Sequence, residues 1–249
     1  MTPSEQLVLD ELELFRREAN DCVTCLYAYL TIHAVGRQNR RVHRQLNEHA
    51  VFWNATLKAL QTALLIALGR VFDNGSPHNV AVLMRTMQAN RAVFSRKALR
   101  IRKQPIFAND PAGLTTYMKD VAAPHRGDFR RIANQVRRWR AAYERVYKTL
   151  RDKIFAHLEL TDRAQIDQLF SKTNIRELEK MTTFLTRLQD AFWETFHNGR
   201  RLAVRPTRHA VGRILERPKG AHTVKSIHEE VVGHTRQVLL SLNSLAHRA

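Results

Sequence analysis

FRRIANQVRRWRAAYERVYKTL, residues 129–150, is the stretch that decides the fold. Its apolar residues recur at alternating steps of three and four: Phe129, Ile132, Val136, Trp139, Tyr143, Val146 and Leu150. This spacing places them on one face of an α-helix, while seven of the remaining positions carry Arg or Lys. The stretch therefore predicts a long amphipathic helix that packs through one face.

Other long segments show the same spacing, so the sequence predicts an all-α protein. They run from Val8 to Tyr29, from Leu46 to Val71 and from Ile175 to Phe196, and a shorter pattern from Val224 to Leu245 closes the chain. Steps of three and four are typical of helices packed side by side at a shallow angle. We expect an elongated four-helix bundle with a basic helical insert and a C-terminal helical extension.

Turn and capping residues set the predicted boundaries. Asp128 is expected to cap the helix that follows it, Asn174 with Glu177 resembles a capping box, and Gly199 fits a helix end. Short helices are also expected around Asn79–Arg91 and Pro111–Ala123. Two parts are predicted: a bundle over residues 1–198 with its insert at about 85–127, and a basic linker with a C-terminal helix packing on the bundle over residues 199–249.

The positive charge is concentrated in two segments. The chain has 41 Lys and Arg residues against 23 Asp and Glu, a formal net charge of +18. Residues 85–140 carry 14 basic and 3 acidic residues, residues 199–225 carry 8 and 1, and the remaining stretches balance. Such segregation is typical of a protein that binds a polyanion, and RNA is the partner we expect. A merely solvated basic face is the alternative that the charges leave open.

Composition also argues against several classes of protein. The longest apolar run, around Thr62 to Gly69, is shorter than the roughly 20 residues of a membrane span, and the N-terminal residues are acidic rather than basic. We therefore expect a cytoplasmic protein without membrane contact. Cys22 and Cys25 form a single C-x-x-C, which we interpret as packing residues, and neither a metal nor another cofactor is expected.

The segment Leu150-Arg151-Asp152-Lys153-Ile154-Phe155-Ala156-His157 contains the candidate chemistry. Histidine titrates near neutral pH and can move a proton to or from a ribose 2′-hydroxyl or a leaving oxygen. Arginine can stabilise negative charge on the phosphate. An arginine and a histidine beside a basic surface are thus the smallest set of catalytic groups that could cleave RNA without a metal ion.

The motif Arg-Asp-Lys-x-x-Ala-His resembles the one that characterises the HEPN superfamily (higher eukaryotes and prokaryotes nucleotide-binding). Together with Leu68-Gly69-Arg70-Val71-Phe72-Asp73 at the end of an earlier helix, it is similar to the abortive-infection branch of that superfamily. The resemblance implies a helical bundle and a metal-independent ribonuclease of toxin–antitoxin or phage-defence systems. It also implies a homodimer in which two motifs face each other. Carried over to this chain, it makes Arg151 and His157 the catalytic pair, with Asp152 orienting or tuning them.

The spacing of Arg151 and His157 constrains how they could act together. On a regular α-helix six positions rotate by about 600°, which leaves the two side chains about 120° apart. We therefore expect either that the helix ends near Ala156 and the chain turns His157 back, or that a second protomer completes the pair. Lys153, four positions before His157, would share its face and contact a phosphate.

Further site residues are predicted from charge and position. The predicted RNA-binding residues are Lys153, Arg130, Arg137, Arg138 and Arg140. Arg70 and Asp73, three positions apart, either form a surface ion pair or, as the resemblance implies, hold the catalytic residues in position without contacting the RNA.

Three functions remain open at this point. The first is a metal-independent endoribonuclease that acts as a toxin or anti-phage effector and cuts by attack of the 2′-hydroxyl. The second is a non-catalytic nucleic-acid-binding helical protein. The third is a helical interaction protein of a toxin–antitoxin pair, whose basic tail docks an acidic partner such as an antitoxin.

Overall fold

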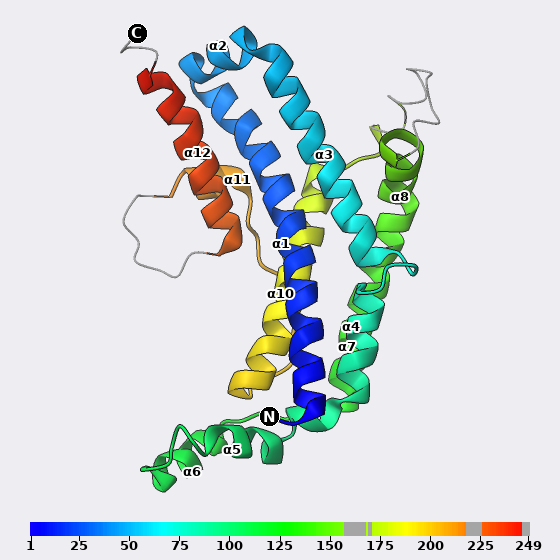
Figure 1. Cartoon of the computed structure of the whole chain (residues 1–249), viewed down its shortest axis with the longest axis vertical. Coiled ribbons are helices and arrows are strands. Elements are labelled where there is room, and N and C mark those ends of the chain that lie inside the picture. Colours follow the sequence, from blue (N-terminus) through cyan, green and yellow to red (C-terminus); the bar gives the residue numbers. More distant parts are fainter. Residues whose placement is uncertain (157–167, 169–170, 218–225, 246–249) are drawn as a thin grey trace. The chain divides into compact units, whose positions relative to one another are not determined.

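The computed structural model describes residues 1–156, 168, 171–217 and 226–245, and every regular element within these residues is helical (Figure 1). The predicted all-α fold is therefore confirmed. The long helices are α1 (Pro3–Gln38), α3 (Ala50–Phe72), α7 (Arg126–Ala142), α10 (Ile175–Asn198) and α12 (Ile227–Leu245). Shorter elements are α2 (Arg40–Glu48), α4 (Val80–Ala89), the 3-10 helix η1 (Arg91–Phe94), α5 (Arg96–Lys103), α6 (Pro111–Lys119) and α11 (Val211–Leu215). After α7 the chain continues through η2 (Tyr143–Tyr147), α8 (Lys148–Leu150) and η3 (Arg151–Ala156).

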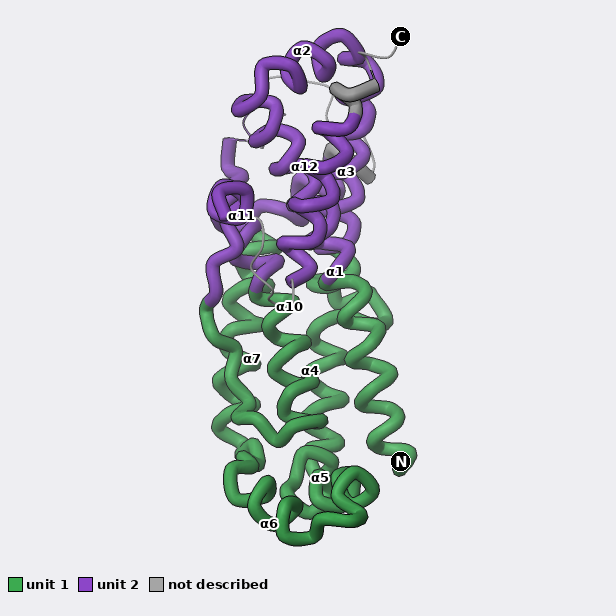
Figure 2. Tube along the Cα trace, turned by 90° about the vertical axis from the view of Figure 1, so that its left-hand side faces the viewer, with its two compact units in different colours: residues 1–19, 69–145, 184–206 green, residues 20–68, 146–183, 207–249 purple. Residues whose placement is uncertain are grey.

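The chain forms two compact units (Figure 2). Unit 1 contains residues 1–19, 69–145 and 184–206, and unit 2 contains residues 20–68, 146–183 and 207–249. Helices α1, α3 and α10 each contribute residues to both units. The predicted division into residues 1–198 and 199–249 stays a prediction.

Phenylalanine rings form the centre of unit 1. The ring of Phe94 in η1 lies 6.3 Å from that of Phe129 in α7, and 6.1 Å from those of Phe192 and Phe196 in α10. All of these side chains are buried. Burying large aromatic side chains is among the strongest favourable contributions to folding. The cluster therefore holds η1 and the first turns of α7 in a fixed place against α10.

The basic insert is anchored in unit 1 by one of its own arginines. The Nη1 of Arg102 lies 2.6 Å from the Oε1 of Glu5, and its Nη2 donates a 2.8 Å hydrogen bond to the carbonyl of Phe196. The guanidinium carbon also lies 4.0 Å above the centre of the Phe196 ring, a cation–π contact. Part of the insert's charge therefore serves packing rather than the binding of a polyanion.

The helix boundaries confirm two of three predicted caps. His125, not Asp128, is the N-cap of α7, and Asp128 instead stands at the third helical position, where its carboxylate accepts the backbone N–H of His125 at 2.9 Å. Asn174 caps α10 as predicted, because its Oδ1 accepts two backbone N–H groups of the first turn. Gly199 ends α10 with a φ of 61°, a left-handed conformation that glycine adopts most readily.

Unit 2 contains a separate apolar cluster that includes the C-terminal helix. The buried members are Ile32 and Val35 of α1, Val42 of α2 and Leu239 of α12. Partly buried side chains of α2, α3 and α11 pack around them: Leu46, Trp53, Leu57, Leu60 and Leu215. Within this unit, α12 is thus held by the same kind of apolar contact that holds α1 and α2 together.

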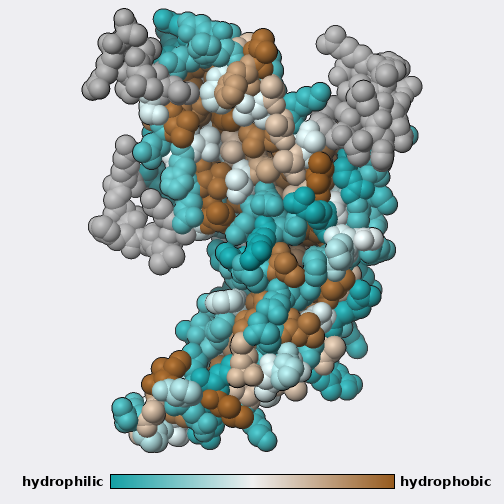
Figure 3. Space-filling view, viewed as in Figure 1, coloured by the Kyte–Doolittle hydropathy of each residue, from teal (hydrophilic) through white to brown (hydrophobic). Residues whose placement is uncertain are grey.

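Helix α3 exposes much of its apolar surface (Figure 3). Val51 is 88% exposed, Phe52 63% and Ile66 40%. Among the described residues α3 is also the one helix that is long and apolar enough, by length and composition alone, to cross a membrane; its best window has a mean hydropathy of 1.4 and is 22% buried. The run-length criterion missed this helix, because single polar residues such as Asn54, Lys58 and Gln61 interrupt its apolar run. Length and composition do not distinguish a membrane span from a helix that another protein surface covers.

Candidate active site

The helix that carries the motif departs from α-helical geometry twice. Tyr143–Tyr147 and Arg151–Ala156 are π-helical, and the short α8 separates them. In a π-helix the backbone hydrogen bonds join residues five apart rather than four, and such segments are rare and frequent at functional sites. The predicted 120° separation of Arg151 from His157, and the face that Lys153 was predicted to share with His157, assumed α-helical rotation, whereas residues 151–156 are π-helical. His157 lies outside the described residues, so both stay predictions.

Arg151 and Asp152, the first residues of η3, pair with each other. The Nε and Nη2 of Arg151 donate to the Oδ1 of Asp152 at 2.8 and 2.6 Å, and the two side chains are 18% and 35% exposed. Two charge-assisted bonds to one oxygen fix the plane of the guanidinium, which is the geometry that the predicted orienting role requires. Lys153 is exposed beside them. His157, the other predicted catalytic residue, lies outside the described residues, so the catalytic pair stays a prediction.

Tyr147 holds the π-helical segment that precedes the motif. Its ring is buried, and its hydroxyl donates to the Oε2 of Glu177 at 3.1 Å and to the carbonyl of Asn174 at 3.3 Å. Glu177 and Asn174 belong to the first turn and the N-cap of α10. The residue one turn before Arg151 is therefore tied to the start of another helix in unit 2.

A family model for AbiU2, a HEPN protein, matches residues 7–210. The chain belongs to the AbiU2 family. The match contains Arg151, Asp152 and His157, and it confirms the resemblance to HEPN proteins of the abortive-infection type that the motif indicated. Neither a curated protein nor a solved structure matches the chain. Helices α11 and α12 follow the matched region, so they lie outside the part by which this AbiU2-family chain is recognised.

The predicted RNA-binding arginines of this AbiU2-family chain lie on α7, in unit 1. Arg130, Arg137 and Arg138 are exposed, and Arg130 and Arg137 stand two turns apart on one face of the helix. Arg137 donates to Asn134, one turn earlier. Arg140 is half-buried and its Nε pairs with the Oε1 of Glu144 at 2.9 Å. Three of the four are thus accessible, whereas Arg140 already has an acidic partner.

Arg70 and Asp73 were predicted to be an ion pair or to support the site. The Nε of Arg70 lies 2.6 Å from the Oε2 of Glu18 on α1, so it does form an ion pair, with a partner distant in sequence. The backbone N–H of Asp73 donates to the carbonyl of Gly69 at the end of α3. Both residues belong to unit 1 and the motif belongs to unit 2, so a supporting role stays a prediction.

Unit 2 contains a ring cluster that was not predicted from the sequence. The rings of His209 and His228 stack at 4.2 Å and 8°, and the ring of Tyr27 meets that of His228 edge-on at 4.7 Å. The Tyr27 hydroxyl donates to the backbone carbonyl of His209 at 2.7 Å, and burial is the main cause that raises the pKa of this tyrosine. The cluster ties α12 to the end of the AbiU2-matched region. Sequence spacing could not find it, because its members come from three distant segments.

Proposed function

We propose that this abortive-infection HEPN protein is a metal-independent endoribonuclease. The observation that carries the proposal is the ion pair between Arg151 and Asp152 in a π-helical turn. Arg151 lies six positions before His157, and all three residues belong to the region that the family model matches. The proposed roles are those of the motif. His157 moves protons, Arg151 stabilises charge on the phosphate, and Asp152 keeps the guanidinium oriented.

The proposed reaction conserves atoms and charge. The ribose 2′-oxygen attacks the neighbouring phosphorus, its proton passes to a base, and the P–O5′ bond breaks as an acid protonates the leaving oxygen. The products are a 2′,3′-cyclic phosphate and a 5′-hydroxyl. Because one histidine cannot be base and acid at the same instant, a homodimer that presents two motifs suits this chemistry.

The exposed apolar face of α3 supports the dimer as part of the proposal. Val51, Phe52 and Ile66 would be shielded from water by a second copy of the chain, as large exposed apolar side chains are at most interfaces. Light scattering after size exclusion should give the mass of a dimer, and Phe52→Glu should shift it to the monomer. A monomeric wild-type protein would count against the dimer.

The product ends test the reaction most specifically. Purified protein is incubated with mixed RNA in excess EDTA, and the fragments are treated with a kinase and with a cyclic phosphodiesterase. We expect fragments with a 5′-hydroxyl that accept phosphate from the kinase, and 3′ ends that the phosphodiesterase opens. Fragments with 5′-phosphates, or cleavage only after metal is restored, would contradict the proposed mechanism.

A non-catalytic nucleic-acid-binding protein is the second candidate, favoured by the accessible arginines of α7. It predicts RNA binding that falls steeply with salt and does not change in a His157→Ala variant. Expression in cells distinguishes the ribonuclease from this binder and from a passive partner of an antitoxin. A cytoplasmic ribonuclease toxin should arrest growth, and Arg151→Ala should abolish the arrest.

A further inference from the structure

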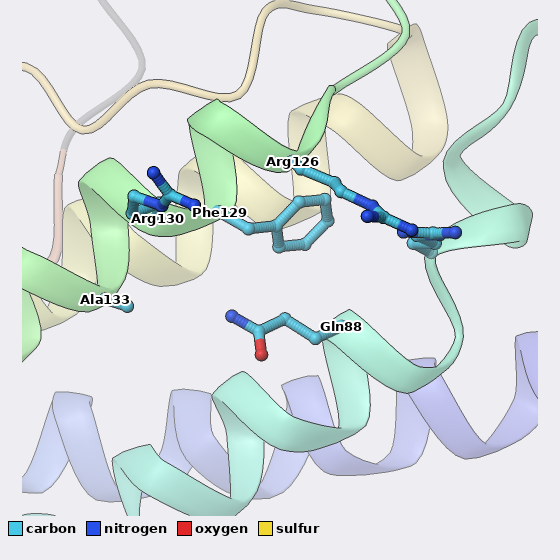
Figure 4. A pocket seen from close by; sticks show the side chains of 6 residues that line it. Gln88, Arg126, Phe129, Arg130 and Ala133 are labelled. Atoms are coloured by element: carbon cyan, nitrogen blue, oxygen red, sulfur yellow. The ribbon is translucent and has the colours of Figure 1, made fainter.

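A pocket in unit 1 is lined by three arginines, and the proposed ribonuclease function assigns no joint role to them. It lies between α4 and α7, has a volume of about 340 Å³, and is lined by Gln88, Arg91, Arg126, Phe129, Arg130 and Ala133. In Figure 4 Gln88 extends from α4 towards α7, while Phe129 and Arg126 extend from α7 on the other side of the space. Of these residues, Arg130 alone was predicted from the sequence to bind RNA.

The fold explains why these residues line one space. Arg126 and Arg130 are four positions apart at the start of α7, so they lie one above the other on the same face. Phe129 is only 4% exposed, and its contact with Phe94 fixes η1, the element that begins at Arg91. The pocket walls are therefore part of the rigid aromatic centre of unit 1.

The charge of the pocket is unbalanced. Arg91, Arg126 and Arg130 are all exposed, and in the part of the chain that the structure describes they take part in no ion pair or side-chain hydrogen bond. Neighbouring arginines on the same helix do have acidic partners: Arg131 pairs with Asp128 and Arg140 with Glu144. Arg126 and Arg130 also stand near the positive end of the α7 dipole, where cations are disfavoured. An anion bound at this helix end would be favoured by the same dipole.

We infer that this pocket binds the phosphate of a nucleotide. A phosphomonoester carries about −1.5 to −2 charges near pH 7 and offers three acceptor oxygens, whereas a phosphodiester carries one charge. Three guanidinium groups match the former better, since each can donate paired hydrogen bonds to phosphate oxygens. The Gln88 amide adds a donor and an acceptor for a base edge, and the volume lies in the range of small-ligand sites. The phosphate is either the terminal phosphate of an RNA or that of a free nucleotide.

The inference does not rest on the proposed ribonuclease function. All the lining residues belong to unit 1, and the Arg151 motif belongs to unit 2. Binding can be measured without any cleavage, with the full chain. Failure of one proposal therefore leaves the other standing.

Calorimetric titration of the full chain with adenosine 5′-monophosphate, and with adenosine at the same ionic strength, tests the pocket. We expect the monophosphate to bind at least about tenfold more tightly than adenosine, because the nucleoside cannot use the guanidinium groups. Arg126→Gln and Arg130→Gln should each weaken the monophosphate about tenfold. Arg100→Gln, an exposed arginine of α5 outside the pocket, removes the same charge from the same unit and should leave its affinity within about twofold.

A second comparison identifies the source of the phosphate. If the ligand is an RNA end, a 5′-phosphorylated oligoribonucleotide should bind at least about tenfold more tightly than its 5′-hydroxyl twin, and Arg126→Gln should erase the difference. If the ligand is a free nucleotide, the two oligonucleotides should bind alike while the monophosphate still binds. Undetectable binding of every phosphate probe, equal binding of adenosine and its monophosphate, or equal losses in the pocket and control variants would overturn the inference.

Discussion

The hydroxyl of Tyr147 lies 3.1 Å from the Oε2 of Glu177, and this bond joins the end of one π-helical segment to the first turn of α10. Glu177 was predicted to complete a capping box with Asn174. Its carboxylate is also the acceptor for a buried phenol four residues before Arg151. The geometry of the candidate site therefore depends on a contact far from it in sequence.

Tyr147→Phe should lower the free energy of unfolding by about 1 kcal/mol, because the Glu177 carboxylate and the Asn174 carbonyl lose their hydroxyl donor while the ring stays in place. Urea unfolding followed by circular dichroism measures the change. Glu177→Gln keeps an oxygen acceptor at this position and should cost less than Glu177→Ala. Equal stability of Tyr147→Phe and the wild type would show that the contact contributes nothing.

The buried pair of Glu5 and Arg102 predicts a pH-dependent contribution to stability. Burial alone would raise the pKa of Glu5, but the N–H of Thr2 and the Arg102 guanidinium lower it below the ordinary 4.5. Stability from this carboxylate is therefore present above pH 4.5 and is lost as the pH falls through its lower folded-state pKa. Glu5→Gln should destabilise the protein by about 2 kcal/mol at pH 7, and the difference from wild type should shrink towards pH 3.

An exposed ion pair supplies the control for that experiment. Glu13 pairs with Arg16 at 2.7 Å, and both side chains are more than a third exposed. The hydrogen bond from Arg16 is the main cause that lowers the pKa of Glu13 to about 2. Solvent screening nevertheless limits the expected cost of Glu13→Gln to below about 1 kcal/mol at pH 7. A larger loss from Glu13→Gln than from Glu5→Gln would refute this assignment of the two pairs.

Gly199 predicts a steric effect on stability. A Cβ added there would lie 2.6 Å from the Cδ2 of Leu99 and 2.8 Å from the Cγ1 of Val121, and the φ of 61° disfavours any L side chain. Gly199→Ala should therefore destabilise the protein by about 2 kcal/mol or more in urea unfolding. Gly233→Ala is the matched control: it lies within α12 with nothing within 4 Å of its added Cβ, and it should be neutral or stabilising by up to about 1 kcal/mol.

Apolar spacing predicted the long helices because each buries a continuous stripe over many turns. It failed for α5, where Leu99 is the one buried residue of an eight-residue helix and no period can develop. It also failed to show the break at His49 between α2 and α3. The short helix α5 and the break at His49 depend on one or two contacts each. A hydrophobic pattern measured over many residues does not detect such local features.

The part of the candidate site that is local in sequence was predictable, and the part that depends on tertiary contacts was not. The motif at Arg151 could be found because it is local in sequence, as is its partner Asp152. The π-helical segment at Tyr143–Tyr147 could not, because the apolar pattern from Phe129 to Leu150 continues through it without interruption. The second segment begins at Arg151, after the pattern has ended. The partner of Arg70 and the pocket at Arg126 depend on tertiary contacts that no spacing reveals.

The exposed arginines of α7 predict a salt-dependent effect on RNA binding. Replacing Arg130, Arg137 and Arg138 together by Gln should weaken binding and reduce the slope of log affinity against log salt by about 2, since each lost phosphate contact removes about 0.7 on a single strand. Fluorescence anisotropy with a labelled oligoribonucleotide over a salt series measures both. Lys58, Lys172 and Lys180, exposed outside both basic segments, provide a triple Gln control whose slope should stay unchanged.

Single-turnover RNA cleavage in EDTA tests the central claim most directly, with wild type, Arg151→Ala, His157→Ala and Arg176→Ala compared at equal helical content. Arg176 is an exposed arginine of α10 outside the motif. The ribonuclease account predicts that the wild type and Arg176→Ala cut at similar rates, and that loss of either motif residue slows cleavage by about 100-fold or more. Undiminished cleavage by a folded His157→Ala or Arg151→Ala protein, or no cleavage by the wild type across varied RNAs, would contradict it.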